Sequence, residues 1–179
     1  LKKVVFWFFM LCMFSYGVYS ASNIASKACA GVVLDGCLFE GVPLMGLVSA
    51  IFTSLFIGSE YSDGTIRNKL VVGHSRMRIY LANLIVCSIA SILISLAYTA
   101  GVFVIVNMKG GELITETGVI TMCMICGLLI SVTFTSIMTL LAILNTNKAG
   151  NVVISMVLAL VLLVSGAFIH QRLNEPKIY

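Results

Sequence analysis

Long apolar runs alternate with short polar segments along the whole chain. A helix needs about 20 apolar residues to cross a bilayer, because each residue adds about 1.5 Å and the hydrocarbon core is about 30 Å thick. The runs are close to this length or longer, and they lack the amphipathic spacing of soluble helices. The pattern predicts an all-α, polytopic transmembrane helix bundle that forms a single domain over residues 1–179. The predicted spans are residues 4–19, 42–58, 79–106, 119–144 and 151–169.

Composition excludes a water-soluble enzyme. Of the 179 residues, 60% are hydrophobic and only 10% are charged, whereas soluble domains carry about 25% charged residues. The net charge of +4 comes from basic residues in the segments between the runs, where membrane orientation explains them. We therefore expect the lipid bilayer, and no nucleic acid, as a partner.

The basic residues also predict which side of the membrane each segment occupies, because cytoplasmic segments are enriched in Lys and Arg. If the N-terminus is cytoplasmic, the inner segments hold more of these residues than the outer ones. We therefore predict a cytoplasmic N-terminus and a cytoplasmic loop at residues 59–78. The inner residues are then Lys2, Lys3, Arg67, Lys69, Arg76, Arg78 and Lys148, and the outer ones are Lys27, Lys109, Arg172 and Lys177.

The predicted spans contain no Asp, Glu, Lys, Arg or His. Ion-driven carriers often place such a residue on the transport path, so this pattern disfavours a secondary carrier. If the protein moves a substrate uphill, the energy should enter from outside the bilayer. Small residues recur in the spans, which predicts close helix packing. They include Gly46, Ser49, Ala50, Ser88, Ala90, Ser91, Ser95, Gly127, Ser131, Ser165, Gly166 and Ala167.

The sequence offers no catalytic, cofactor or metal site. Cys123 and Cys126 form a C-x-x-C pair without a second pair or a nearby His, which is more typical of packing residues than of zinc or redox chemistry. Cys29 and Cys37 share a loop, and a disulfide between them is the less favoured interpretation. His74 has no neighbouring ligand and is better explained as a turn residue. The chain also lacks the G-x-x-x-x-G-K-[ST] loop that binds nucleotide phosphates.

The loop at residues 59–78 has the signals of a short amphipathic helix. Ser62 is a suitable N-cap, and Gly73 can end the helix in a left-handed conformation. Ser75 can then cap the following helix. Ile66 and Leu70 are four residues apart and are expected to share a face. On these features alone, an interfacial helix that touches lipid head groups is favoured.

The residue order in this loop points to a second interpretation. The chain reads EYSDGTIRNKL from Glu60 to Leu70, GHSR from Gly73 and IYLANL from Ile79. This order resembles a segment of bacterial ABC transporter permeases of the type 2 exporter family. The RLNEP sequence from Arg172 is similar to a tract of the same permeases, although Lys177 and Ile178 depart from it.

The resemblance implies a permease subunit of an ATP-driven exporter in the bacterial cytoplasmic membrane. It implies six spans, a second permease subunit in a homo- or heterodimer, and an ATP-binding cassette subunit that binds the ATP. A sixth helix beyond Tyr179, and residues before Leu1, are expected on the same ground. This chain would then be a transport subunit without its own ATPase site. The alternative is a non-transporting membrane protein, such as a sensor or an immunity component.

The resemblance also assigns a role to the loop. In the family, this loop carries the coupling helix that docks on the ATPase. On this basis we expect Ile66 and Leu70 to fill a groove on the ATPase, with charged residues around them setting the register. The residues to which the coupling role carries over are Glu60, Tyr61, Ser62, Asp63, Gly64, Thr65, Ile66, Arg67, Asn68, Lys69 and Leu70.

Overall fold

A computed structural model describes residues 2–27, 35–73, 75–109, 117–144, 150, 152–161 and 164–165. These residues form helices joined by turns, and no strand occurs among them, so the predicted all-α class is confirmed. The main helices are α1 (Lys2–Lys27), α2 (Asp35–Ser62), α3 (Thr65–Val71), α4 (Arg76–Lys109) and α5 (Thr117–Leu144).

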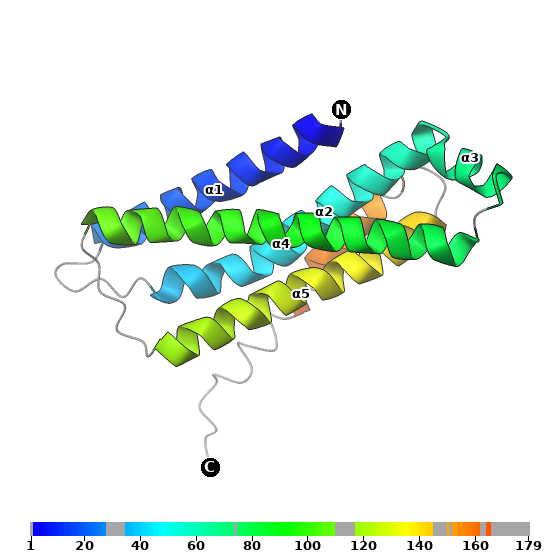
Figure 1. The fold of residues 1–179 in the computed structure, drawn as a ribbon. Helices are drawn as coiled ribbons and strands as arrows, with labels where there is room; N and C mark the ends of the chain where they lie inside the picture. Colours follow the sequence, from blue (N-terminus) through cyan, green and yellow to red (C-terminus); the bar gives the residue numbers. More distant parts are fainter. Residues whose placement is uncertain are drawn as a thin grey trace, which may run out of the picture.

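The four long helices run side by side, and the short α3 lies across one end of the bundle (Figure 1). α1 and α4 run in one direction, while α2 and α5 run in the other. The N-terminus and α3 consequently lie at the same end of the bundle. This arrangement agrees with the prediction that successive polar segments lie at alternate ends of the bundle.

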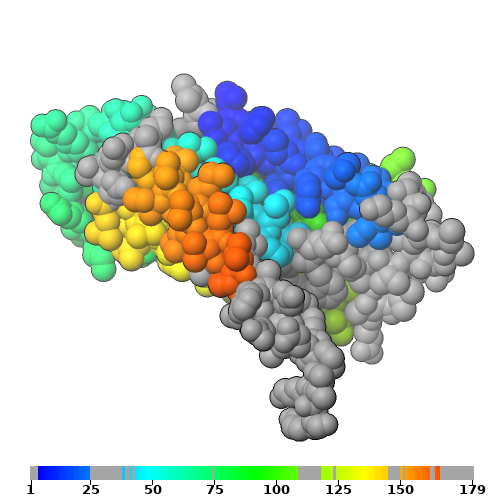
Figure 2. Space-filling model, turned by 180° about the vertical axis from the view of Figure 1, so that it is seen from behind, coloured from blue at the N-terminus to red at the C-terminus, as the bar shows by residue number. Residues whose placement is uncertain are grey.

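Four helices are long and apolar enough to cross a membrane: Val4–Ile24, Pro43–Ser62, Arg76–Met108 and Gly118–Leu144. Of the predicted fifth span, the structure describes a shorter apolar helix, Val152–Val161. Figure 2 shows this segment, in orange, beside the end of α5, in yellow. Its Ala159 is fully buried in a cluster with Ala50 of α2 and Met138 of α5.

The helices extend further than the apolar runs predicted. The spans predicted at residues 4–19 and 42–58 left residues 20–41 between them, but α1 continues to Lys27 and α2 already begins at Asp35. Polar residues end a span without ending its helix, because backbone hydrogen bonding continues past the apolar run. Pro43, the second residue of the predicted span, therefore lies inside α2 and beyond its first turn.

α1 and α4 cross with their backbones in direct contact. A Cβ atom added to Gly17 of α1 would clash with the carbonyl oxygen of Tyr98, and one added to Gly101 of α4 would clash with that of Phe14. Each helix thus presents a glycine to the main chain of the other. This close approach is the usual way in which helices associate in lipid, where no hydrophobic force drives them together.

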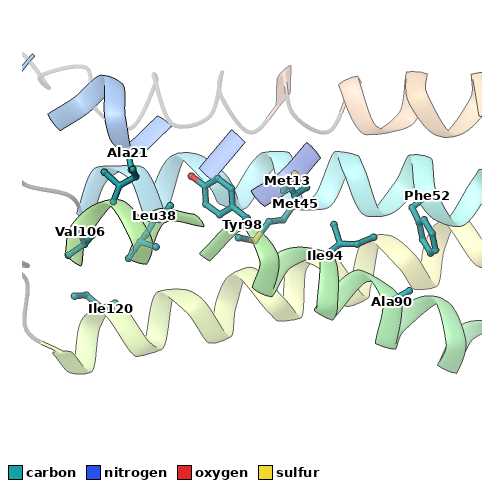
Figure 3. Packing of buried hydrophobic residues seen from close by; sticks show 12 residues of the cluster. Met13, Ala21, Leu38, Met45, Phe52, Ala90, Ile94, Tyr98, Val106 and Ile120 are labelled. Atoms are coloured by element: carbon teal, nitrogen blue, oxygen red, sulfur yellow. The ribbon is translucent and has the colours of Figure 1, made fainter. Parts of the chain in front are cut away.

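Tyr98 is the largest side chain that the bundle buries completely. Its ring stacks on that of Tyr16, with centroids 5.9 Å apart, and it fills a space that Gly41 of α2 leaves open. Figure 3 shows Tyr98 among the apolar side chains between the helices. That cluster comprises Met13, Ala21, Leu38, Met45, Phe52, Ala90, Ile94, Tyr98, Val102, Ile105, Val106 and Ile120.

α2 and α5 meet at small residues that the sequence had indicated. Gly46 lies against the ring of Phe134, with 3.2 Å from the position of an added Cβ to the nearest ring carbon. The Ser49 hydroxyl donates to the carbonyl of Gly46 at 2.8 Å and reaches the Ser131 carbonyl of α5 at 3.5 Å. The predicted packing role of these small residues is confirmed at this interface.

The α1–α4 crossing can be tested with one methyl group. Gly101→Ala places a Cβ against backbone that cannot move aside, and overpacking of this kind costs about 1–3 kcal/mol. Gly118→Ala is the matched control, because an added Cβ there meets nothing within 4 Å. We expect a lower midpoint of thermal unfolding in detergent for Gly101→Ala only. Equal midpoints for the two variants would show that the crossing is looser than described.

Candidate functional site

The loop between α2 and α4 is built around a tight turn at Asp63 and Gly64. The Asp63 amide donates to the Ser59 carbonyl at 2.9 Å, and the Gly64 amide donates to the Tyr61 carbonyl at 3.0 Å. Gly64 has a φ of 67°, which is unfavourable for residues with a Cβ, and it occupies the N-cap position of α3. The predicted N-cap at Ser62 is therefore wrong, because Ser62 is still the last residue of α2.

The other end of α3 agrees with the sequence. Gly73 has a φ of 94°, and its amide donates to the Leu70 carbonyl at 3.0 Å, so it ends the helix in a left-handed conformation as predicted. The Ser75 carbonyl accepts from the amides of Arg78 and Ile79 at 3.0 and 3.2 Å, which places Ser75 at the start of α4. His74 lies outside the described residues.

The inner face of α3 is held by apolar packing. Ile66 is only 4% exposed and joins a buried cluster that draws on three long helices. The cluster sits where α2 and α5 end and α4 begins; α3 packs directly on α2 and α4, and the cluster continues from them to α5. Its buried members are Ile57, Ile66, Ile79, Cys87 and Ala142, and Phe56, Tyr61 and Ile143 pack against it.

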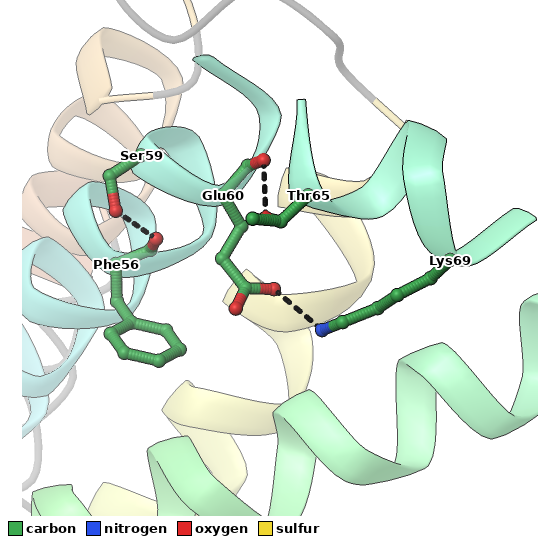
Figure 4. Close-up of polar contacts among 5 residues, drawn as sticks. All are labelled: Phe56, Ser59, Glu60, Thr65 and Lys69. Atoms are coloured by element: carbon green, nitrogen blue, oxygen red, sulfur yellow. Dashed lines mark hydrogen bonds and ion pairs between the residues drawn. The ribbon is translucent and has the colours of Figure 1, made fainter. Parts of the chain in front are cut away.

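Polar contacts from Glu60 reach the same face of α3 (Figure 4). The Thr65 hydroxyl donates to the Glu60 carbonyl at 2.8 Å. The Lys69 ammonium lies 3.5 Å from Oε2 of Glu60, whose side chain is 10% exposed against 40% for that of Lys69. Because α2 extends to Ser62, Glu60 belongs to the end of a spanning helix and not to a free loop.

Tyr61 ties the end of α2 to the end of α5. Its hydroxyl donates to the Ile143 carbonyl at 2.7 Å. Ile143 lies in the last turn of α5, where carbonyl groups have no partner within the helix. The bond therefore satisfies an acceptor that would otherwise face an apolar surrounding, and it fixes two helix ends beside α3.

The outer face of α3 carries an exposed aliphatic edge, formed by Leu70, Val71 and Val72. Val71 is 81% exposed and Val72 is 77% exposed. Exposed charged residues of both signs precede and follow this edge in the sequence, and Met77 at the start of α4 is also exposed. These charged residues are Asp63, Arg67, Arg76 and Arg78.

The structure corrects the predicted division of roles in this loop. Ile66 and Leu70 were expected to meet a partner together, but Ile66 is buried in its own chain while Leu70 lies at the edge of the exposed face. At about 100° per residue, the inward face is set by positions 65, 66 and 69, which leaves position 70 at its margin. Likewise, Glu60 and Lys69 pair with each other and are not both free rim charges.

Sequence reasoning did not identify which residues form the buried face and the exposed face of α3. The apolar residues beneath α3 come from three segments far apart in the chain, and no local pattern joins them. The exposed edge did carry a signal, because Leu70, Val71 and Val72 are three consecutive aliphatic residues inside a polar loop.

The described part of the chain contains no group of three or more His, Cys, Asp or Glu that could hold a metal ion. Cys12, Cys87 and Cys126 are free thiols. The side chains of Cys29, Cys37 and Cys123 lie outside the described residues, and with them the C-x-x-C pair and the loop disulfide considered from the sequence.

An apolar pocket lies between α2, α4 and α5, in the half of the bundle away from α3. Met45, Leu96 and Met124 are among the side chains that line it. The hydroxyls of Ser95 and Thr99 also line the pocket, but they donate to carbonyls of their own helix at 2.9 Å. The pocket therefore offers a ligand a mainly apolar surface.

Comparison with known protein families decides between the interpretations of this bundle. A family model described as "ABC-2 family transporter protein" matches residues 1–166, which include all five labelled helices. The chain belongs to the ABC-2 transporter family. It is thus the membrane permease component of an ABC transporter and a multi-pass membrane protein, as the resemblance implied. No curated protein and no solved structure matches the permease.

The two faces of α3 in the permease should respond differently to the same truncation. Ile66→Ala opens a cavity under α3, and such changes cost about 2–5 kcal/mol in a well-packed core. Val71→Ala removes side-chain atoms that touch little, so it serves as the matched control. Hydrogen exchange of the amides at residues 65–71 should accelerate at least about tenfold in Ile66→Ala and stay near wild type in Val71→Ala. Equal protection in both variants would contradict the buried placement of Ile66.

Proposed function

We propose that this permease couples ATP hydrolysis by a partner ATP-binding cassette subunit to the export of a substrate. In this proposal α3 is the element that receives the movement of the ATPase. The observation that carries it is the division of α3 into a face anchored to the bundle and an exposed face that is free to bind. The N-terminus and α3 then lie on the cytoplasmic side, and a second permease subunit completes the membrane pathway.

The anchored face supports the transmission of force. α3 packs on the ends of α2 and α4, the same apolar cluster continues to α5, and Tyr61 adds a hydrogen bond between the ends of α2 and α5. Closely packed interiors transmit displacement because they contain little free space. A push on α3 would therefore move α2 and α4 directly, and α5 through its contacts with these two helices.

The exposed face supports docking. A few well-packed, fully desolvated side chains near the centre of an interface supply most of its affinity, while charges at the rim set orientation and association rate. Leu70, Val71 and Val72 offer such anchors, and Asp63 and Arg67 lie exposed near them. This surface fits a partner groove that is apolar at its centre and charged at its edges.

The sequence also supports ATP bound by the partner subunit as the source of energy. The predicted spans hold no Asp, Glu, Lys, Arg or His for ion coupling, and the chain has no phosphate-binding loop. Glu60, Arg76 and Arg78 of the longer helices lie at the helix ends next to α3. ATP is accordingly assigned to the partner subunit, and this chain needs no cofactor of its own.

A second candidate rests on the exposed Arg76, Met77 and Arg78 at the start of α4. Basic and apolar side chains together can hold a segment at the membrane interface. In this alternative the loop anchors the permease at the membrane interface, and no ATPase binds α3.

Docking can be tested at Val71, the most exposed apolar residue of α3. Val71→Asp adds a charge at the centre of the proposed contact without disturbing the fold, and it should weaken binding of the co-expressed ATP-binding cassette subunit by about 10-fold or more. Val71→Ile keeps the site apolar and is the matched control, with binding close to wild type. Affinity is measured with the permease in lipid nanodiscs.

Unchanged binding by Val71→Asp would remove α3 from the docking surface. Failure of the wild-type permease to bind the ATPase at all would favour the membrane-anchor alternative. Because the ATPase is cytoplasmic, binding at α3 would also establish that this end of the bundle faces the cytoplasm.

A further inference from the structure

Glu60 is a carboxylate buried at the end of a spanning helix. The residue is 8% exposed, although burial of a charge is unfavourable unless it is paired and hydrogen-bonded. Glu60 lies in the last turn of α2, just before the two residues, Asp63 and Gly64, that connect α2 to α3.

Glu60 contacts α3 at two points that are one helical turn apart. Its carbonyl accepts from the Thr65 hydroxyl at 2.8 Å, and its carboxylate lies 3.5 Å from the Lys69 ammonium. Residues four apart lie on the same side of a helix. Glu60 therefore holds one side of α3 along its length, as Figure 4 shows.

These contacts supply what the apolar cluster lacks. Hydrophobic burial is non-directional, so Ile66 keeps α3 close to the bundle but sets its rotation about its own axis only coarsely. A hydrogen bond and an ion pair at two separate points fix that rotation. Since the carboxylate is largely buried, salt in the solvent screens the ion pair less than it would at the surface.

The covalent connection alone would not keep α3 rigid. Only two residues join α2 to α3, and one of them, Gly64, has a backbone with few steric limits. A load on the exposed face of α3 would bend this turn before it moved α2. The Glu60 contacts bridge the turn from one helix to the other.

We propose that Glu60 is a positioning residue that locks α3 to α2, so that movement of a docked ATPase reaches the spans. The inference rests on the proposed function, since it requires an ATPase on α3. It assigns Glu60 to transmission and not to docking, although the sequence had grouped it with the docking residues.

One titration of the ATPase with the permease measures docking and transmission separately. The permease in nanodiscs is added to a fixed amount of the ATP-binding cassette subunit, and ATP hydrolysis is measured. The half-saturating concentration reports docking, and the maximal stimulated rate reports transmission. Glu60→Gln preserves shape and removes charge. Its half-saturating concentration should stay within about twofold of wild type, while its stimulated rate should fall at least about fivefold.

Variants of Lys69, the ion-pair partner of Glu60, control for a general effect on folding. Lys69→Gln alters a partly exposed side chain and should lower the stimulated rate as Glu60→Gln does, whereas Lys69→Arg keeps the charge and should restore it. The double variant Glu60→Gln, Lys69→Gln should be no worse than either single one, because both act through the same contact. Glu112→Gln, in the segment between α4 and α5, is the control for loss of a carboxylate.

The outcomes distinguish the two proposals. A stimulated rate within about twofold of wild type in Glu60→Gln or in Lys69→Gln overturns the positioning role while docking stands. A change confined to the half-saturating concentration overturns it too, because Glu60 would then belong to the docking surface. No stimulation by the wild-type permease overturns the proposed function itself, and the positioning role with it.

Discussion

Within a bilayer no water is present to bond with the main chain, and this constraint governs the whole molecule. Every backbone amide and carbonyl in the hydrocarbon must find its partner inside the protein, and a helix meets this requirement within a single segment. Several buried hydroxyls follow the same rule, although those of Thr53 and Ser54 in α2 do not. Those of Thr135 and Thr139 each donate to the carbonyl one turn earlier in α5, at 2.7 Å. With polar groups satisfied within each helix, association depends on close contact, which Gly17 and Gly101 provide.

The constraint ends where the helices leave the membrane, and α3 lies at that boundary. Its inner face continues the apolar packing of the bundle, because Ile66 joins a cluster with α2, α4 and α5. Its outer face has no such partner within the described part of the chain and presents aliphatic side chains to the surroundings. A helix that belongs to the bundle on one side and is open on the other is suited to carry movement between a membrane domain and a partner.

Features that depend on neighbouring residues could be predicted from the sequence. The apolar runs predicted the helices, Gly73 predicted the end of α3, and Gly46, Ser49 and Ser131 predicted close packing. Features that depend on contacts across the fold could not. No local pattern shows that Gly17 faces Gly101, that Glu60 turns toward Lys69, or that Ile66 is buried while Val71 is exposed. In a seven-residue helix, a shift of one position decides which side faces inward, and only the surrounding helices determine it.

The most direct test of the two-faced α3 is a photo-crosslinking scan along the helix in the assembled transporter. A photoreactive amino acid is placed in turn at each position from Thr65 to Val71. The account predicts crosslinks to the ATP-binding cassette subunit from positions 67, 68, 70 and 71, and crosslinks within the permease from positions 65, 66 and 69. Crosslinks to the ATPase from position 66, or crosslinks to lipid alone from position 71, would contradict the account.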